Sequence, residues 1–338
     1  MLAEETLSDA SFMVDRTGFE AANSQYEVKP EDANDWSSAV FMQSDSKEEC
    51  YKIDTGNGEQ KNMAKRIPAD FHMHTHHSGD SEAPMEMMIE KAIERKVPEI
   101  CITEHMDFDY PVNEHDTAGI FEVNTDEYMA ETVILKEKYK DRITVNFGIE
   151  LGLQPHLVER NSEYAKSYPF DFIIGSNHLC NGKDPYYMSF YEERSEKEAF
   201  TEFFESTLEN IKLFDDFDVL GHLDYIVRYA PNLNKSYKYK DYSDVLDEIL
   251  KTLISKGKGL DINTKSIYSE PSLGDPNPSR EIISRYKELG GEILTFGSDA
   301  HKPEHVALGF ETAVHIVKSC HFKYYATFSQ RRASFHKL

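Results

Sequence analysis

Short apolar runs alternate with amphipathic stretches along most of the chain. Seven runs rich in Val, Ile, Leu and Phe have the length of strands, and they lie at residues 67–72, 99–105, 143–150, 170–178, 218–224, 259–264 and 292–301. Stretches of helical composition lie between most of them, at residues 86–96, 125–140, 196–212, 242–256 and 279–289. Strands that alternate with helices in this way predict βα units and a parallel sheet.

The length of this repeating region favours a closed barrel over an open sheet. The seven strands span residues 67–301, and a (β/α)-barrel domain typically needs about 250 residues. An open doubly wound sheet is the structural alternative. Its dinucleotide-binding form is disfavoured, because no glycine-rich phosphate loop follows the first strand.

Residues 1–62 differ in composition from the rest of the chain. They are rich in Asp, Glu, Ser and Asn, and their scattered apolar residues form no sustained strand pattern. The sequence therefore predicts an acidic, polar N-terminal extension at residues 1–62, disordered or only partly ordered, and one domain at residues 63–338. A start codon assigned too far upstream would give the same appearance.

The net charge limits the kinds of molecule that the protein can bind, and the cysteines indicate the cellular compartment in which it works. The formal net charge is −24, with 61 acidic against 37 basic residues, which disfavours nucleic acid as a partner. No apolar run approaches the roughly 20 residues of a membrane span, and the N-terminus lacks the pattern of a secretory signal. Cys50, Cys101, Cys180 and Cys320 form no C-x-x-C pair. This spacing argues against a disulfide framework or a thiolate zinc site, and a cytoplasmic protein is expected.

Polar residues able to bind a metal or a substrate lie at the end of each strand run. The carboxyl ends of strands in a parallel barrel face the active site, so these side chains should converge. A lone His-x-His pair is more often structural, but repetition at seven strand ends predicts bound cations, since so many unpaired polar groups would be costly to bury. The polar residues of this pattern are Asp70, His72, His74, Asp80, Glu104, His105, Glu150, His178, His222, Asp224, Asn263, Asp299 and His301. The nine candidate ligands among them are His72, His74, Asp80, His105, Glu150, His178, His222, Asp299 and His301.

The chemistry of these ligands limits which metal ions the site can bind. Imidazole and carboxylate ligands without thiolate suit Zn, Fe or Mn. Nine candidates are too many for one four-coordinate ion, so the sequence predicts two or three divalent ions with a carboxylate as bridge.

Four motifs resemble those of the PHP superfamily of phosphoesterases (polymerase and histidinol phosphatase). They are Asp70-Phe71-His72-Met73-His74, Thr103-Glu104-His105, Gly148-Ile149-Glu150 and Ser298-Asp299-Ala300-His301. Within that superfamily, the segments HTHHSGDSEAP, FDFIIGSNH, DVLGHLDYIVRYAP and GGEILTFGSDAH are most similar to the monofunctional histidinol-phosphate phosphatases. The resemblance covers about residues 66–332.

This resemblance implies a distorted (β/α)₇ barrel with a trinuclear metal site. His72, His74, Glu150 and Asp299 would hold the first ion, Asp80, His105 and His301 the second, and Glu150 would bridge to a third held by His178 and His222. It also implies hydrolysis of L-histidinol phosphate to L-histidinol and phosphate in histidine biosynthesis. A metal-bridging hydroxide would attack phosphorus in line, with Glu150, Asp299 and His301 as catalytic residues and Asp299 or a neighbouring His as proton carrier.

A phosphate ester also needs cationic donors in the protein. Arg228, just past the fifth strand, is the first candidate, and Lys265, two residues after Asn263, is the second. His77 lies beside the first motif and is a third candidate, with an ordinary loop histidine as the equal alternative. Arg160 and Arg194, in helical stretches, are weaker candidates.

Three other functions share parts of this pattern. A PHP nuclease is disfavoured by the strong acidity and by the absence of flanking polymerase sequence. Metal-dependent amide or lactone hydrolases often use a carboxylated lysine at a strand end, and no lysine closes the first five strands. A non-catalytic metal-binding module is disfavoured by the complete set of ligands with basic candidates beside it.

Overall fold

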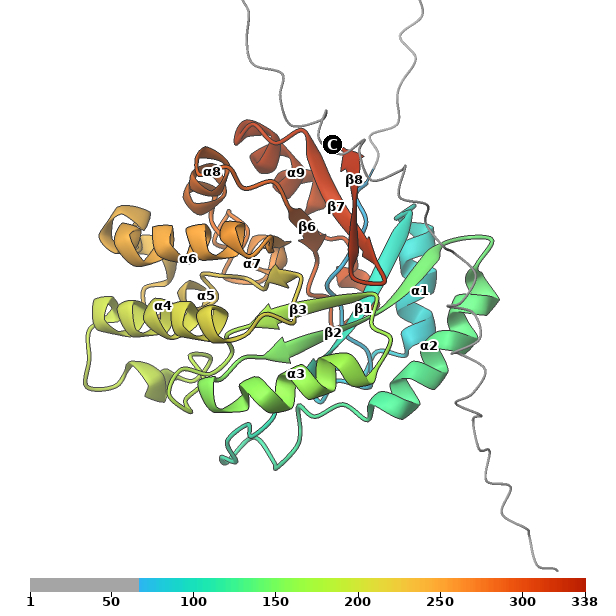
Figure 1. Ribbon diagram of the computed structural model, residues 1–338, viewed down its shortest axis with the longest axis horizontal. Helices are drawn as coiled ribbons and strands as arrows, with labels where there is room; N and C mark the ends of the chain where they lie inside the picture. The colour runs from blue at the N-terminus through green and yellow to red at the C-terminus, as the bar shows by residue number, and fades with distance from the viewer. Residues whose placement is uncertain (1–66) are drawn as a thin grey trace, which may run out of the picture. The chain divides into compact units, whose positions relative to one another are not determined.

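The computed structural model describes residues 67–338, and the predicted extension at residues 1–62 lies outside the described residues. Its core is a curled parallel sheet in which each strand pairs with the next one along the chain (Figure 1). The strands are β1 (Glu99–Met106), β2 (Thr144–Gly152), β3 (Phe172–Ser176), β4 (Val219–Leu220), β5 (Gly259–Asn263) and β6 (Leu294–Gly297). Nearly every residue of β2 to β6 is buried, as expected of parallel strands that are covered on both faces.

The first predicted strand bridges the two edges of this sheet. On one side Thr103 of β1 donates its N–H to the carbonyl of Met73 (2.9 Å). On the other side the N–H of Phe71 donates to the carbonyl of Phe296 in β6 (2.7 Å), and that of His74 to the carbonyl of Ala300 (2.8 Å). The segment therefore takes the place of a seventh strand between β1 and β6, and the predicted α/β barrel is confirmed.

Amphipathic helices cover the outside of the sheet. They are α1 (Met85–Glu94), α2 (Thr125–Tyr139), α3 (Val158–Ser167), α4 (Glu196–Leu213), α6 (Ser243–Ser255), α8 (Arg280–Glu288) and α9 (Phe310–Ser319), with one-turn helices α5 (Ile226–Tyr229) and α7 (Lys265–Tyr268). Leu246, Ile249, Leu250 and Leu253 of α6 are buried at helical spacing. A capping box of Ser195 and Glu198 begins α4. No helix within residues 67–338 has the length and apolarity that a membrane crossing requires.

The apolar pattern of the sequence does not predict helix α3. Only Asn161 and Ala165 of its ten residues are buried, so the segment carries too few apolar positions to show a helical period.

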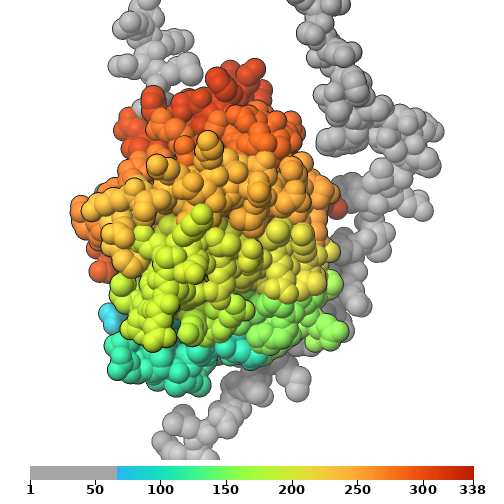
Figure 2. Space-filling view, turned by 90° about the vertical axis from the view of Figure 1, so that its left-hand side faces the viewer, coloured from blue at the N-terminus to red at the C-terminus, as the bar shows by residue number. Residues whose placement is uncertain are grey.

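Neighbouring units along the chain are also neighbours in space. The arrowheads of β2 and β3 point to the left in Figure 1, so Figure 2 looks onto the face that carries the carboxyl ends of the strands. The colours on that face follow the chain from teal at the bottom to red at the top. Loops that follow successive strands therefore meet around one opening.

A C-terminal hairpin covers the opposite end of the barrel. It consists of β7 (Tyr324–Ser329) and β8 (Arg332–Lys337), which pair antiparallel. The ring of Phe328 lies 5.0 Å from that of Phe172 in β3, and the ring of Tyr325 lies 5.8 Å from that of Phe296 in β6 (centroid to centroid). The hairpin thus buries apolar side chains that the barrel would otherwise expose at its floor.

The hairpin is not predicted by the apolar pattern, because its turn lacks the usual residues. Gln330 and Arg331 both have positive φ (49° and 64°), where Asn and Gly are the common choices. Asp171, before β3, offsets the strain: its side chain accepts the N–H of Gln330 (3.0 Å) and its carbonyl that of Arg331 (2.9 Å). Arg331 also pairs with Asp218. Tertiary contacts therefore stabilise the turn.

Candidate metal centre and active site

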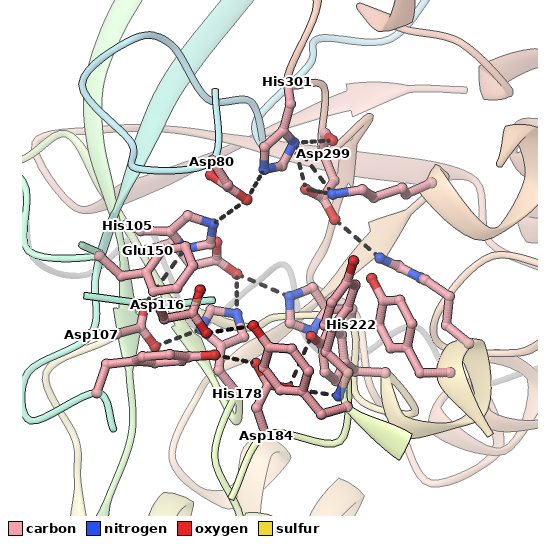
Figure 3. Close-up of a pocket in the computed structure, with 18 residues that line it drawn as sticks. Asp80, His105, Asp107, Asp116, Glu150, His178, Asp184, His222, Asp299 and His301 are labelled. Carbon is pink, nitrogen blue, oxygen red and sulfur yellow. Dashed lines mark hydrogen bonds and ion pairs between the residues drawn. The ribbon is translucent and has the colours of Figure 1, made fainter. Parts of the chain in front are cut away.

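All nine predicted ligands lie together at the carboxyl ends of the strands, around the carboxylate of Glu150. Figure 3 shows those that line the cavity, which are all but His72 and His74. Glu150 lies near the end of β2 and is completely buried. Its oxygens lie within 3.5 Å of five imidazoles, which belong to His72 (3.1 Å), His74 (3.5 Å), His105 (3.2 Å), His178 (3.2 Å) and His222 (3.0 Å). One carboxylate therefore holds the centre of the cluster.

The remaining ligands extend the cluster toward the loop after β6. The Oδ2 atom of Asp80 lies 2.8 Å from Nε2 of His301 and 3.8 Å from Nε2 of His105. The Oδ1 atom of Asp299 lies 3.6 Å from Nε2 of His74. Asp299 adopts a positive φ of 53°, which Asp tolerates better than most residues.

A glycine permits the close approach of β6 to the first ligands. A Cβ atom on Gly297 would lie 2.3 Å from Cβ of His72 and 2.6 Å from Oδ1 of Asp261. Any side chain at position 297 would therefore push β6 away from the ligands on the first segment.

Charges within the cluster depend strongly on one another. Burial raises the pKa of Glu150, but His72, His178 and His105 hold it well below its usual range. Burial lowers the pKa of His72, and the carboxylates of Glu150 and Asp261 raise it well above its usual range. For His74 burial and the neighbouring imidazoles act together, so its pKa lies well below its usual range. Without bound cations, the buried carboxylate of Glu150 can be neutralised only by protonated imidazoles, since within residues 67–338 its ion-pair partners are all histidines.

The cluster has the properties of a metal site. Several of its donor atoms are buried and make no hydrogen bond: Nε2 of His72, His74 and His301, Nδ1 of His105, and Oε2 of Glu150. The ligand atoms of His72, His74 and Glu150 all lie within 4.8 Å of one another, as do those of His74, His105 and His301. Because buried polar atoms rarely stay unpaired, and imidazole with carboxylate suits divalent transition ions, these residues fit bound metal.

Two further carboxylates orient the histidines from behind, and the sequence did not single them out. Nδ1 of His72 donates to Oδ2 of Asp261 (2.8 Å), and Nδ1 of His178 donates to Oδ1 of Asp107 (2.7 Å). Each contact turns the Nε2 atom toward Glu150 and fixes the tautomer that binds metal. Both carboxylates sit two residues from a polar residue of the pattern, Asp107 after His105 and Asp261 before Asn263, which is the available sequence signal.

Asp261→Asn should weaken metal binding about 10- to 100-fold, as loss of a carboxylate behind a metal-bound histidine generally does. The amide keeps the size of the side chain but cannot hold the Nδ1 proton of His72 as a carboxylate does. Competition with a coloured chelator measures the affinity, and Asp141→Asn, on an exposed turn, is the matched control. Equal affinities for the two variants would contradict this orienting role.

Two of the three predicted phosphate-binding residues reach the cluster. Arg228, in the one-turn helix α5, places Nη1 3.3 Å from Oδ2 of Asp299. Lys265, after β5, places Nζ 3.1 Å from Oδ1 of the same carboxylate. Both side chains line the cavity beside the metal ligands, so the guanidinium and the ammonium lie on one side of it.

The third predicted phosphate-binding residue lies elsewhere. Nε2 of His77 pairs with Oε2 of Glu131 on α2 (2.8 Å), and His77 is not among the residues that line the cavity. The structure thus fits the alternative of an ordinary loop histidine. Arg160 and Arg194 do not line the cavity either, since they pair with Asp109 and Glu202 respectively.

The cavity itself has a volume of about 440 Å³. Half of its wall consists of residues that the sequence did not assign to the site. These are Asp107, Tyr110, Asp116, Phe121, Asp184, Tyr186, Tyr187, Tyr225 and Tyr229. They come mainly from the loops after β1, β3 and β4, and they make this half acidic and aromatic.

Comparisons with known proteins agree with this geometry. The family model of the PHP domain matches residues 70–265. The histidinol-phosphatase of Lactococcus lactis is 33% identical over 261 residues, which cover 77% of this chain and 94% of the relative. A probable histidinol-phosphatase of Clostridium acetobutylicum is 35% identical over 254 residues (75% and 94%).

A solved structure is similar over the same region. It is the histidinol phosphate phosphatase of Lactococcus lactis, complexed with zinc, L-histidinol and phosphate. The two chains are 32% identical with a TM-score of 0.72, and the match covers 80% of this chain and 99% of the other.

Proposed function

The chain belongs to the PHP-domain family, and from this premise we propose that it is a histidinol-phosphatase. It hydrolyses L-histidinol phosphate to L-histidinol and phosphate, as a phosphomonoesterase that depends on metal. The two relatives described above are a histidinol-phosphatase and a probable one, and the similar solved structure holds L-histidinol and phosphate. The observation that carries the proposal is the convergence of eight further metal-type ligands around Glu150, beside Arg228 and Lys265.

We propose that the cluster holds two or three divalent ions of Zn, Fe or Mn. His72, His74, Glu150 and Asp299 would hold one ion, Asp80, His105 and His301 another, and Glu150 with His178 and His222 a third. Bound ions would supply a hydroxide at neutral pH and neutralise charge on the phosphoryl group. The contacts of Glu150 with five imidazoles support its place as the bridging ligand.

The cationic side chains on the cavity wall bind the phosphate in this proposal. Arg228 is buried, and its guanidinium is held by Asn263, Asn277 and Asp299. These contacts use the N–H groups of Nε and Nη2 and one of those on Nη1, and they fix the plane of the guanidinium so that its remaining Nη1 N–H can donate to a phosphate oxygen. Lys265 adds a second positive charge within reach of the same place.

Proton transfer is assigned to Asp299, with His301 beside it. Burial raises the pKa of Asp299, but Lys265 and His72 hold it well below its usual range, so the group is a carboxylate. It can accept the proton of the attacking water and pass it toward the leaving oxygen. His301 shares this side of the cavity, with Nδ1 3.5 Å from Oδ1 of Asp299.

We further propose that the enzyme acts in histidine biosynthesis and works in the cytoplasm. The cysteines among residues 67–338 are Cys101, Cys180 and Cys320, and all three are free and buried. Free thiols support a reducing compartment.

Release of phosphate from L-histidinol phosphate by the purified protein, with Mn²⁺ or Zn²⁺ added, tests the proposal. A nucleotide and a sugar phosphate serve as comparison substrates at equal concentration. Fast release from L-histidinol phosphate alone is expected. Equal or faster release from the comparison substrates, or none from L-histidinol phosphate, would leave a PHP phosphoesterase that acts on another ester.

A further inference from the structure

Two neighbouring histidines face one glutamate outside the catalytic cavity. Nε2 of His77 lies 2.8 Å from Oε2 of Glu131, and Nε2 of His76 lies 3.4 Å from the same oxygen. The two imidazole rings lie side by side, with their centroids 4.2 Å apart. Neither histidine lines the cavity that holds Glu150. The three side chains therefore form a separate group, which we call the peripheral cluster.

A turn after the first segment of the barrel brings the two histidines to the same side. Side chains of adjacent residues on a strand point in opposite directions. His76 and His77 lie in a turn instead, so both rings can face helix α2, where Glu131 lies near the middle. His77 and Glu131 are 54 positions apart, so the peripheral cluster exists only in the folded protein.

A buried carboxylate holds this turn in place. Glu104 of β1 accepts the N–H and the hydroxyl of Thr75 (3.0 Å and 2.5 Å) and the hydroxyl of Ser78 (2.5 Å). Between these two anchors, the N–H of His76 donates to the carbonyl of Ala83 (2.8 Å). The backbone that carries both histidines is thus fixed, and binding of a ligand costs little further conformational entropy there.

The spacing of the donor atoms suits a small transition ion. Zinc lies about 2.0–2.2 Å from its nitrogen and oxygen ligands, so that a tetrahedral site places these atoms about 3.3–3.5 Å from one another. The contact of His76 with Glu131 already has this length (3.4 Å). The contact of His77 (2.8 Å) would have to lengthen by about 0.5 Å. One ligand atom from each of the three residues lies within 4.8 Å of the other two.

A cation explains the second imidazole, which an ion pair does not need. One protonated histidine is enough to pair with Glu131, and two protonated rings so close together would repel each other. Two neutral imidazoles, by contrast, can each offer a lone pair to one ion. Within residues 67–338 the ion-pair partners of Glu131 are these two histidines alone, so no lysine or arginine of the described chain competes for its charge.

Partial exposure leaves the peripheral cluster open to an ion from solution. The side chain of His77 is 10% exposed, that of Glu131 32% and that of His76 44%. Three protein ligands with an open fourth position for water make a common zinc arrangement. The cluster can therefore take up an ion without any movement of the catalytic cavity.

We propose that His76, His77 and Glu131 form a peripheral site for one divalent transition ion such as Zn²⁺, with one position left to water. Imidazole and carboxylate ligands without thiolate suit Zn, Ni or Cu. This ion is additional to those proposed for the catalytic cluster, and it does not contact the phosphate ester. It joins the turn that carries Asp80 to helix α2.

The zinc content of the full-length protein tests this site. The wild type, His76→Gln and Glu131→Gln are dialysed against a buffer of fixed free Zn²⁺ and analysed for metal and protein. Each variant should hold one ion per chain fewer than the wild type and keep its phosphatase activity. His315→Gln and Glu137→Gln, which change exposed residues on α9 and α2, should hold as many ions as the wild type.

Chemical modification of histidine locates the ion without any use of activity. Diethyl pyrocarbonate reacts with exposed imidazoles, and mass spectrometry of peptides gives the rate at each residue. Zn²⁺ at about ten times its dissociation constant should slow the reaction of His76 about tenfold in the wild type. Glu131→Gln should lose this protection, while the exposed His315 should react at one rate with and without zinc.

Either measurement can overturn the peripheral site. Equal zinc content in the wild type and in both variants would do so, as would a rate at His76 that zinc does not change. Protection of His76 that is lost in Glu131→Gln supports the site even where a variant also loses ions from the catalytic cluster.

Discussion

Glu150→Gln should remove bound metal and phosphatase activity together while leaving the fold largely intact. The amide has the shape of the carboxylate but lacks the charge that faces five imidazoles and that the proposed ions would need. We expect kcat/KM to fall by about 10³-fold or more, which corresponds to about 4 kcal/mol of transition-state stabilisation. Elemental analysis of the purified variant and phosphate release measure the two losses.

The control for this variant is Glu137→Gln, an exposed glutamate on α2. It should keep both metal and activity. Circular dichroism of the two proteins shows whether the barrel remains folded. Full activity or wild-type metal content in Glu150→Gln would contradict the bridging role of this residue.

Arg228→Ala should lower kcat/KM by about 10²- to 10³-fold, or about 3–4 kcal/mol. The guanidinium is pre-oriented by Asn263, Asn277 and Asp299, so its loss removes a donor fixed for the phosphate oxygens. It also leaves these buried acceptors unpaired, at a cost of about 1–3 kcal/mol in stability. The assay is therefore run well below the unfolding temperature, which is measured for each variant.

Two further measurements distinguish a role of Arg228 in phosphate binding from a role in holding Asp299 in place. Inorganic phosphate should inhibit Arg228→Ala much more weakly than the wild type, and added guanidinium should restore part of the activity. Arg228→Lys should recover less than the native residue, because an ammonium lacks the planar fork. An unchanged inhibition constant for phosphate would assign Arg228 a structural role alone.

The convergence of the candidate ligands could be predicted from sequence because two regular features combine. Residues two apart on a strand point the same way, which places His72 beside His74. The carboxyl ends of barrel strands meet at one face, which brings Glu150 to Asp299 across the barrel. Both features follow from the strand pattern, so the candidate ligands at the strand ends converge as expected, whereas Asp80 lies in the turn after the first segment.

The residues that the sequence did not reveal depend on contacts between distant loops. Asp116 and Asp184 come together only because the loops after β1 and β3 exchange hydrogen bonds through Tyr110 and Tyr187. His77 turns toward Glu131, which lies 54 positions further along the chain. No local pattern encodes these choices.

The segment between β1 and β6 has a consequence for the order in which the protein matures. Its hydrogen bonds join Phe71 to Phe296 and His74 to Ala300. The residues that pair with this side of the segment are therefore synthesised more than 200 residues after it. Contacts of such long range form slowly. His74 and Asp299 can share an ion only after this pairing, and metal loading should therefore follow completion of most of the chain. A nascent chain stalled before β6 would expose seven of the nine candidate ligands to whichever metal the cell offers.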